Sequence, residues 1–178
     1  TEPSFSKADF GEKFVWGVAT AAFQIEGGAN SDGRAPSIWD KFCQKEGAIA
    51  DGSDGQIACD HYNRLEEDLD HIASLGVNAY RFSVSWSRVQ PLGDGAWNES
   101  GFAFYDRLIS GLERRGIQAH LTLFHWDLPQ ALDDRGGWIN EDVLDCFARY
   151  AREICLRFGD RLASICTFNE PWVISILG

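Results

Sequence analysis

The chain has 178 residues, of which 44% are hydrophobic, so it is long enough to bury a sizeable core as one domain. Sixteen Lys and Arg residues stand against 27 Asp and Glu residues, and the formal net charge is -11 at pH 7. This charge repels phosphate backbones and anionic lipid surfaces, and it therefore argues against nucleic acid and membranes as partners.

The amino terminus lacks the basic and then apolar stretches of a secretory signal, and no run of about 18 apolar residues occurs. The chain starts at Thr1 and contains no Met, which is compatible with a trimmed amino terminus. The five cysteines are odd in number, and three of them fall in apolar helix or strand patterns, so we expect reduced thiols in the core. These features favour a cytoplasmic location. The cysteines are Cys43, Cys59, Cys146, Cys155 and Cys166.

Strand-like apolar runs alternate with helix-like patterns along the chain. The predicted strands span residues 14–19, 78–86, 117–126 and 163–170. The predicted helices span residues 62–75, 101–115 and 140–158. Residues 27–60 are rich in Gly, Ser and Asp without a strong period, which predicts a long loop of the kind that often carries function.

The ends of the predicted helices carry suitable residues. Asn140 can accept hydrogen bonds from the free amides of the first turn of helix 140–158. Gly76 and Gly116 follow the other two helices, and Gly159 can close helix 140–158 in a left-handed conformation. The apolar face of that helix consists of Val143, Phe147, Tyr150, Ala151, Ile154 and Phe158.

The order helix, Gly, strand recurs about every 40 residues, as βα units with a parallel sheet do. Four such units are half of a (β/α)8 TIM barrel, and no Gly-rich phosphate fingerprint supports a doubly wound sheet instead. The predicted fold class is therefore α/β. We expect residues 1–178 to form the amino-terminal portion of a single TIM-barrel catalytic domain.

Polar residues that packing does not explain cluster at the predicted strand ends, where barrel enzymes carry their catalytic groups. The first strand leads into Gln24 and Glu26, the second contains Arg81, the third ends in His125, Trp126 and Asp127, and the fourth ends in Asn169 and Glu170.

Glu170 fits the chemistry of glycosidic bond cleavage. That reaction needs one carboxylic acid to protonate the leaving oxygen and a second carboxylate to attack or stabilise the anomeric carbon. The apolar run 165–168 predicts a low-dielectric setting that keeps Glu170 protonated. Asn169 could donate to the sugar 2-hydroxyl.

Each of these residues also has a structural interpretation. Glu170 before Pro171 could be a helix-start carboxylate, His125 a hydrogen-bonded core histidine, and Trp126 and Trp172 packing residues.

Other chemistries find less support in the sequence. His61, His71, His120 and His125 give no ligand pair at useful spacing, so neither a metal nor another cofactor is expected. No Ser lies in a nucleophile elbow, and no Cys has an activating neighbour.

A series of strings resembles glycoside hydrolase family 1, the β-glucosidase family, in the family's order. The strings are FVWGVATAAFQIEGG (14–28), GRAPSIWDKF (33–42), DGSDGQIACDHYNRLEEDL (51–69), AYRFSVSWSRVQP (79–91), LTLFHWDLPQAL (121–132), GGWIN (136–140) and TFNEPW (167–172).

The resemblance implies a retaining β-glycosidase in which Glu170 of TFNEP is the acid/base. It implies that Gln24, His125 and Trp126 bind the outer sugar hydroxyls, and that Asn169 binds the 2-hydroxyl. Arg81 would orient the nucleophile, and Trp172 would lie toward the leaving-group sugar. Trp39, Asp60 and Trp138 are structural residues in the family pattern.

Two details of the resemblance bear on the substrate. Members that act on 6-phospho sugars tend to carry Phe and Met-Pro where this chain has Trp126 and Leu128-Pro129, which favours an unphosphorylated sugar. The thioglucosidase branch carries Gln in place of Glu170. Ala35 stands where the family usually has Gly, and we expect this difference to be neutral.

The family's nucleophile, in a late E-N-G motif, has no counterpart in the chain. We therefore expect these residues alone to be inactive, with the remaining barrel half supplied by the same protein or by an associated chain. The alternative is a non-catalytic half barrel that binds sugars or self-associates through open strand edges.

Overall fold

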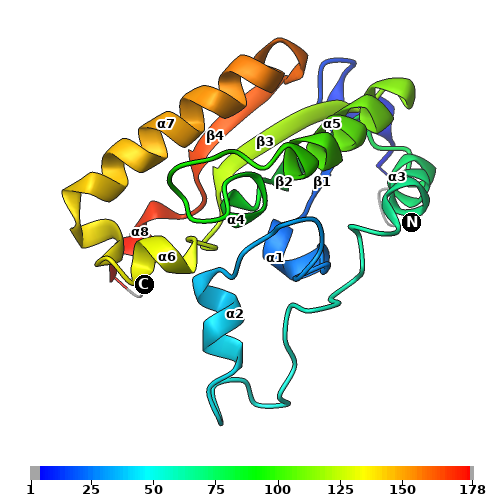
Figure 1. Cartoon of the computed structure of the whole chain (residues 1–178). Helices are drawn as coiled ribbons and strands as arrows, with labels where there is room; N and C mark the ends of the chain where they lie inside the picture. Colours follow the sequence, from blue (N-terminus) through cyan, green and yellow to red (C-terminus); the bar gives the residue numbers. More distant parts are fainter. Residues whose placement is uncertain (1–4, 177–178) are drawn as a thin grey trace.

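The computed structural model describes residues 5–176, which form one parallel sheet covered by helices (Figure 1). The strands are β1 (Gly17–Ala19), β2 (Ala79–Ser83), β3 (Gln118–Phe124) and β4 (Ser164–Phe168). The α-helices are α1 (Ala22–Ile25), α2 (Ile38–Cys43), α3 (Leu65–Ser74), α4 (Trp86–Val89), α5 (Glu99–Arg114), α6 (Gln130–Asp133), α7 (Glu141–Phe158) and α8 (Pro171–Ile176). The 3-10 helices are η1 (Lys7–Phe10), η2 (Gly137–Ile139) and η3 (Gly159–Arg161).

The sheet has the order β1-β2-β3-β4, and every neighbouring pair is parallel. The four predicted strands and the three long predicted helices are therefore confirmed, with shorter strands than the apolar runs suggested. The central strands β2 and β3 are mostly buried, whereas β1 and β4 are exposed because each lies at an edge of the sheet.

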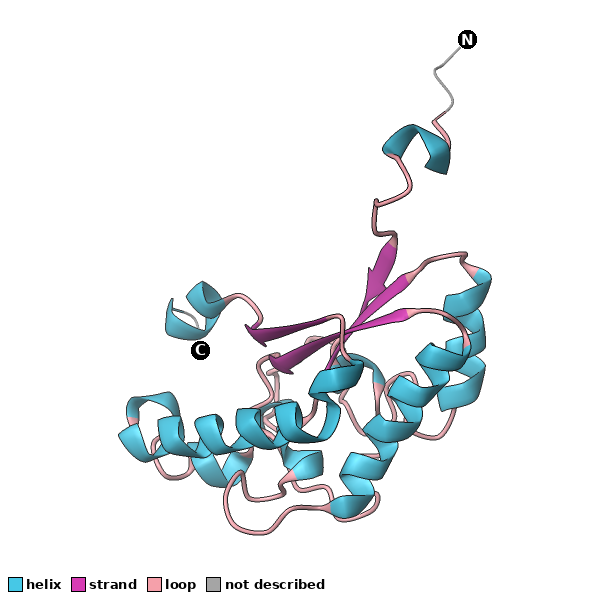
Figure 2. Cartoon of the chain, turned by 90° about the horizontal axis from the view of Figure 1, so that it is seen from above, coloured by secondary structure: helices cyan, strands magenta, loops and turns pink. Residues whose placement is uncertain are grey.

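The long helices α3, α5 and α7 lie on the same side of the sheet (Figure 2). Their apolar faces meet β2 and β3 in one core cluster, as the helical periodicity predicts. On α5, Tyr105, Leu108, Ile109 and Leu112 are almost completely buried. Removing a side chain of this size from water contributes about 1.5–3 kcal/mol.

An aromatic contact ties α7 to the sheet. Tyr150 stacks on Trp86 with ring centroids 4.8 Å apart, and its hydroxyl donates to the carbonyl of Leu123 on β3 at 2.8 Å. Trp138, predicted to be structural, packs against Trp86 and against Phe124 at 5.0 Å. This cluster supports β3 immediately before its carboxyl end.

Two of the predictions about the helix ends are confirmed, and one is wrong. The side-chain oxygen of Asn140 accepts from the amide of Asp142, which confirms the cap of α7. Gly76 and Gly116 take positive φ values of 67° and 66° after α3 and α5. The prediction for Gly159 is wrong: its φ is -52°, because the chain continues from α7 into the right-handed turn η3.

Residues 27–60 are mostly irregular, as predicted, but they include the helix α2, which the sequence pattern did not indicate. Ser37 and Asp40 start α2 with a reciprocal capping box. Arg34 donates to the same Asp40 carboxylate at 2.7 Å. The loop is therefore anchored by a nearly buried ion pair.

All five cysteines are free, but the expectation of core positions is wrong for most of them. Only Cys146 is buried. Cys155 lies on the exposed face of α7, and Cys166 lies on the edge strand β4. An apolar pattern does not reveal that a strand lies at the edge of its sheet.

Within residues 5–176, no helix combines the length and the apolar character needed to cross a lipid bilayer.

Candidate active site

The carboxyl ends of β3 and β4 bring most of the predicted site residues together. The amide of Asn169 donates to the carbonyl of Phe124 at 2.9 Å, which extends the pairing of these strands by one step. Glu170 follows with φ of 48°, and α8 begins at Pro171. A left-handed conformation at a residue other than glycine costs about 1–3 kcal/mol and is typical of functional sites.

Arg81 reaches from β2 to the end of β4. Its Nη2 donates to Oδ1 of Asn169 at 3.0 Å. Because a guanidinium can only donate, this bond fixes the amide oxygen of Asn169 toward Arg81 and leaves the amide NH2 on the other side. Asn169 is thereby presented as a donor, which is the role that the resemblance gives it toward a sugar hydroxyl.

Trp126 contacts the same segment from β3. Its indole Nε1 donates to the backbone carbonyl of Asn169 at 3.0 Å. Trp126 itself has φ of 76°, so two neighbouring site residues, Trp126 and Glu170, adopt left-handed backbone conformations. A tryptophan in this conformation is uncommon.

His125 lies beside Trp126, with ring centroids 5.5 Å apart. Burial and the nearby charge of Arg81 lower the pKa of His125, while the carboxylate of Glu170 opposes this shift. The imidazole is therefore neutral at pH 7 and carries one donor and one acceptor. Its Nδ1 is buried without a hydrogen-bond partner among the described residues.

Gln24 and Trp172 lie outside this hydrogen-bonded group. Gln24 is an exposed residue of α1, immediately after β1, and so belongs to the same edge of the sheet. Trp172 is 65% exposed in the first turn of α8. Neither side chain hydrogen-bonds to another predicted site residue in the described part of the chain.

The prediction that the run before Glu170 supplies an apolar environment is wrong for this chain. Ile165, Cys166 and Thr167 are exposed, and so is Glu170. The cause is topological, because β4 has no neighbour on its outer side within residues 5–176. Glu170 also directly precedes α8, and its backbone carbonyl accepts from the amide of Val173 at 2.9 Å.

Asp127, noted in the sequence only as a polar strand end, is fully buried instead of facing the mouth. Neither carboxylate oxygen has a partner among the described residues. Burial, together with the nearby carboxylate of Glu26, raises its pKa to about 7. Sequence reasoning missed this environment because a residue one position after Trp126 looks like a further site residue.

Glu26 is also buried and forms an internal ion pair. Its carboxylate accepts from Nε of Arg88 at 2.9 Å and from the hydroxyl of Tyr105 at 2.5 Å. The guanidinium of Arg88 also lies 4.2 Å from the ring centroid of Tyr62. This group joins α4 and α5 to the segment after α1, and therefore supports the loop that carries Gln24.

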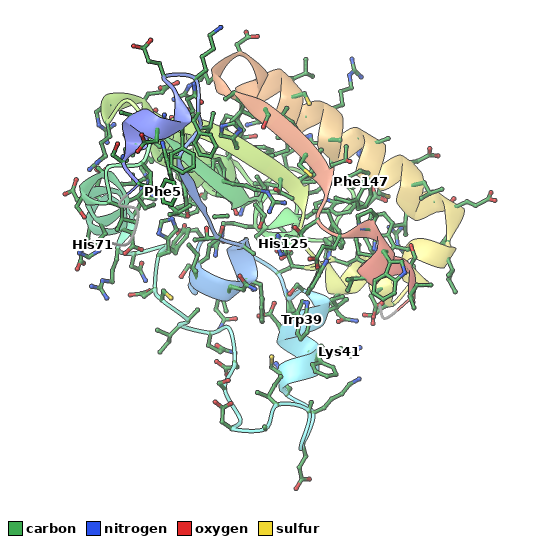
Figure 3. All side chains as sticks on the ribbon, turned by 180° about the vertical axis from the view of Figure 1, so that it is seen from behind. Phe5, Trp39, Lys41, His71, His125 and Phe147 are labelled. Carbon is green, nitrogen blue, oxygen red and sulfur yellow. The ribbon has the colours of Figure 1, made fainter. Side chains whose placement is uncertain are left out.

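Two of the four histidines lie in different parts of the molecule. His71 projects from α3 at the outer edge of the molecule, away from His125 near its middle (Figure 3). Across residues 5–176, no three His, Cys, Asp or Glu side chains are grouped so that they could hold a metal ion.

A parallel α/β sheet with polar side chains gathered at its carboxyl edge is typical of α/β enzymes, among them the (β/α)8 barrels. Residues 6–178 match the model of Glycosyl hydrolase family 1, and the chain belongs to this family. A β-glucosidase of Agrobacterium sp. is 53% identical over 172 residues, which are 97% of this chain and 38% of that protein. Beta-glucosidase 42 of Arabidopsis thaliana is 50% identical over 178 residues, which are 99% of this chain and 36% of that protein.

Solved structures agree with the sequence relatives. The β-glucosidase of Thermotoga maritima, in complex with methoxycarbonyl-substituted glucoimidazole, superposes with a TM-score of 0.92 at 50% identity over 94% of this chain and 38% of that chain. The predicted (β/α)8 fold class is confirmed, with four βα units present here. The chain thus spans less than two fifths of the length of each of these three relatives.

Proposed function

We propose that the chain is the acid/base half of a retaining β-glycosidase that removes terminal glucosyl residues from β-glucosides. The observation that carries the proposal is the placement of Glu170 next to Asn169, whose side chain Arg81 orients as a donor. The many relatives named β-glucosidase support glucose as the sugar.

In the proposed mechanism, Glu170 protonates the leaving oxygen and then, as a carboxylate, activates the water that releases the sugar. Asn169 donates to the 2-hydroxyl, a bond that strengthens as positive charge develops at the anomeric carbon. Gln24 and neutral His125 bind the outer hydroxyls, and Trp172 contacts the leaving-group sugar.

The nucleophile is not among these residues. A retaining mechanism needs a second carboxylate about 5–5.5 Å from the first. We propose that it comes from the remaining four βα units, in the same protein or in an associated chain, and that Arg81 orients it. Residues 1–178 would then be the amino-terminal portion of one catalytic domain. The same units would cover β4 and bury the surroundings of Glu170.

We propose a reducing compartment, the cytoplasm, for this protein. The support is that all five cysteines are free and that Cys59 and Cys155, which lie outside β4, are exposed. Exposed thiols persist where the surroundings keep them reduced.

The test uses a completed protein, in which residues 1–178 are followed by the missing units. These come from the chain's natural continuation or from the part of the Agrobacterium β-glucosidase beyond the 38% matched here. The completed protein should release nitrophenol from nitrophenyl β-glucoside, with the β-anomer of glucose as the first product. A folded protein that releases no nitrophenol, or that forms the α-anomer first, would refute the proposal.

A sugar-binding or self-associating half barrel is the second candidate, and the exposed strand β4 favours it. Sedimentation and glucose titration of residues 1–178 separate the two candidates. A discrete species that binds glucose by itself would support the second.

A further inference from the structure

We propose that Ser83 and Tyr105 are positioning residues for sugar recognition, because they hold the helical turn that carries Gln24 from its two ends. This inference rests on the proposed role of Gln24 as a ligand of the outer sugar hydroxyls. It assigns part of the recognition of these hydroxyls to two buried side chains, one on β2 and one on α5.

The helix that carries Gln24 needs support from outside. Helix α1 has only four residues and therefore completes a single turn. A single turn is unstable in water by itself, because it fixes several residues for one hydrogen bond. The residue before it, Ala21, has no side-chain oxygen that could cap the turn. The position of Gln24 therefore depends on bonds from other elements.

Ser83 supplies the missing cap from β2. It is the last residue of this strand and is 2% exposed. Its hydroxyl accepts from the backbone amide of Ala22 at 2.7 Å, across 61 positions of the sequence. A serine in the N-cap position satisfies the free amides of a helix in the same way. The bond therefore fixes the start of α1 to the end of the neighbouring strand.

Tyr105 acts on the other end of α1 through Glu26. The carboxylate of Glu26 accepts from the hydroxyl of Tyr105 at 2.5 Å and from Nε of Arg88 at 2.9 Å. The hydroxyl of Tyr105 also accepts from the amide of Ser85 at 2.7 Å. The phenol thus uses both its donor and its acceptor capacity, and it fixes the carboxylate two positions after Gln24.

The backbone after α1 is also closely enclosed. The amide of Tyr62 donates to the carbonyl of Glu26 at 2.9 Å. Gly27 has φ of 61°, and a Cβ there would lie 2.1 Å from the carbonyl oxygen of Ile57. Gln24 is exposed between these buried ends of the turn. Its side chain can therefore reach a sugar while its backbone is restrained on both sides.

Loss of either bond should displace Gln24 rather than the reacting groups. Neither side chain has a hydrogen bond to Asn169 or Glu170 within residues 5–176. A misplacement of about 1 Å in a substrate-positioning group can cost about 10²-fold in rate. Recognition of the hydroxyl that Gln24 binds should therefore weaken. A substrate without this hydroxyl should be much less affected.

The experiment makes Ser83→Ala and Tyr105→Phe in the completed protein, each alone and each combined with Gln24→Ala. The measured quantity is kcat/KM for nitrophenyl β-glucoside and for its 3-deoxy and 4-deoxy analogues. Each change should lower kcat/KM for the glucoside by about tenfold, but by less than about threefold where Gln24 is already Ala. The loss should also shrink on the deoxy analogue on which Gln24→Ala has the smaller effect.

Ser37→Ala is the matched control, because Ser37 is a buried serine whose hydroxyl bonds to Asp40 and not to α1. Any loss in this variant should be the same with and without Gln24.

Losses that are additive with Gln24→Ala, or that are equal on all three glucosides, would overturn the inference. So would a loss in Ser37→Ala that depends on Gln24 in the same way. If Ser83→Ala does not fold, Tyr105→Phe decides, since it removes one oxygen and keeps the ring in the core.

Hydrogen exchange separates this inference from the proposed function. Ser83→Ala should accelerate exchange of the Ala22 amide by about tenfold, because the amide loses its acceptor, whereas Ser37→Ala should not. An unchanged rate overturns the inference even in an active enzyme. Accelerated exchange in a protein that hydrolyses no glucoside would sustain the support of α1 by Ser83 while the proposed function fails.

Discussion

The guanidinium of Arg81 on β2 donates to the side-chain oxygen of Asn169 beyond β4, over 3.0 Å. This contact crosses β3 and joins two predicted site residues that are 88 positions apart in the sequence. It defines which end of the Asn169 amide faces the open site. The two side chains should therefore act as one unit toward a sugar 2-hydroxyl.

A double-mutant cycle tests this coupling in the completed protein. Asn169→Ala should lower kcat/KM for a nitrophenyl β-glucoside by about 10²-fold or more, because the lost bond is strongest in the transition state. Arg81→Met should cost less once Asn169 is already Ala, since the two changes remove one interaction. Fully additive losses would show that the two residues act separately.

Asp127 should make stability fall as pH rises. Its folded pKa of about 7 lies above the ordinary value of 3.8, so the folded state holds a proton that the unfolded state releases. The stabilisation is present below pH 4 and is lost as pH rises to about 7. The shift corresponds to a difference on the order of 4 kcal/mol.

Thermal unfolding at pH 4, 6 and 8 measures this effect. The melting temperature of Asp127→Asn relative to the unsubstituted completed protein should increase with pH, because the amide does not ionise. A difference that is constant across this range would contradict the raised pKa of Asp127.

The buried pair of Glu26 and Arg88 should matter far more for stability than an exposed pair. Arg88→Met leaves the carboxylate of Glu26 without its charged partner in the interior, and should destabilise the fold by about 3–5 kcal/mol. Glu26→Gln combined with Arg88→Met should recover part of this loss, because no uncompensated charge remains.

Arg114→Met is the matched control for this prediction. Arg114 pairs with Glu66 at the surface, and exposed pairs contribute about 0–1 kcal/mol. Denaturant unfolding of the three variants gives the comparison. Equal destabilisation by Arg88→Met and Arg114→Met would contradict the account of the buried pair.

The order of the elements could be read from the sequence because apolar periodicity and helix-ending glycines depend on neighbouring residues alone. Helix α5 illustrates this: its buried face and Gly116 after it are both as predicted. The short helix α2 was not predicted, because a helix of six residues within a Gly-rich loop is too short to show apolar periodicity.

Exposure proved harder to predict than element type. The exposure of Cys166 and Glu170 depends on what lies beyond β4, and an apolar run gives no information on that neighbour. Similarly, nothing in the string HWD distinguishes half-buried His125 from fully buried Asp127. The difference arises only when the chain turns at Trp126, whose φ is 76°.

The sequence indicated which polar residues follow the strands, but not the contacts among them. The strand ends identified Glu170, Asn169 and His125 as neighbours. The bond from Trp126 to the carbonyl of Asn169 involves backbone, which side-chain identities do not reveal.

The most direct measurement of the central claim is azide rescue of Glu170→Ala in the completed protein. With dinitrophenyl β-glucoside, whose leaving group needs no proton, removal of the acid/base should slow mainly deglycosylation, because no general base then activates the attacking water. Added azide should restore turnover and yield β-glucosyl azide, since it attacks without a general base. Turnover by Glu170→Ala that is unchanged from the unsubstituted protein, or a slow variant that azide does not accelerate, would contradict the assignment of Glu170.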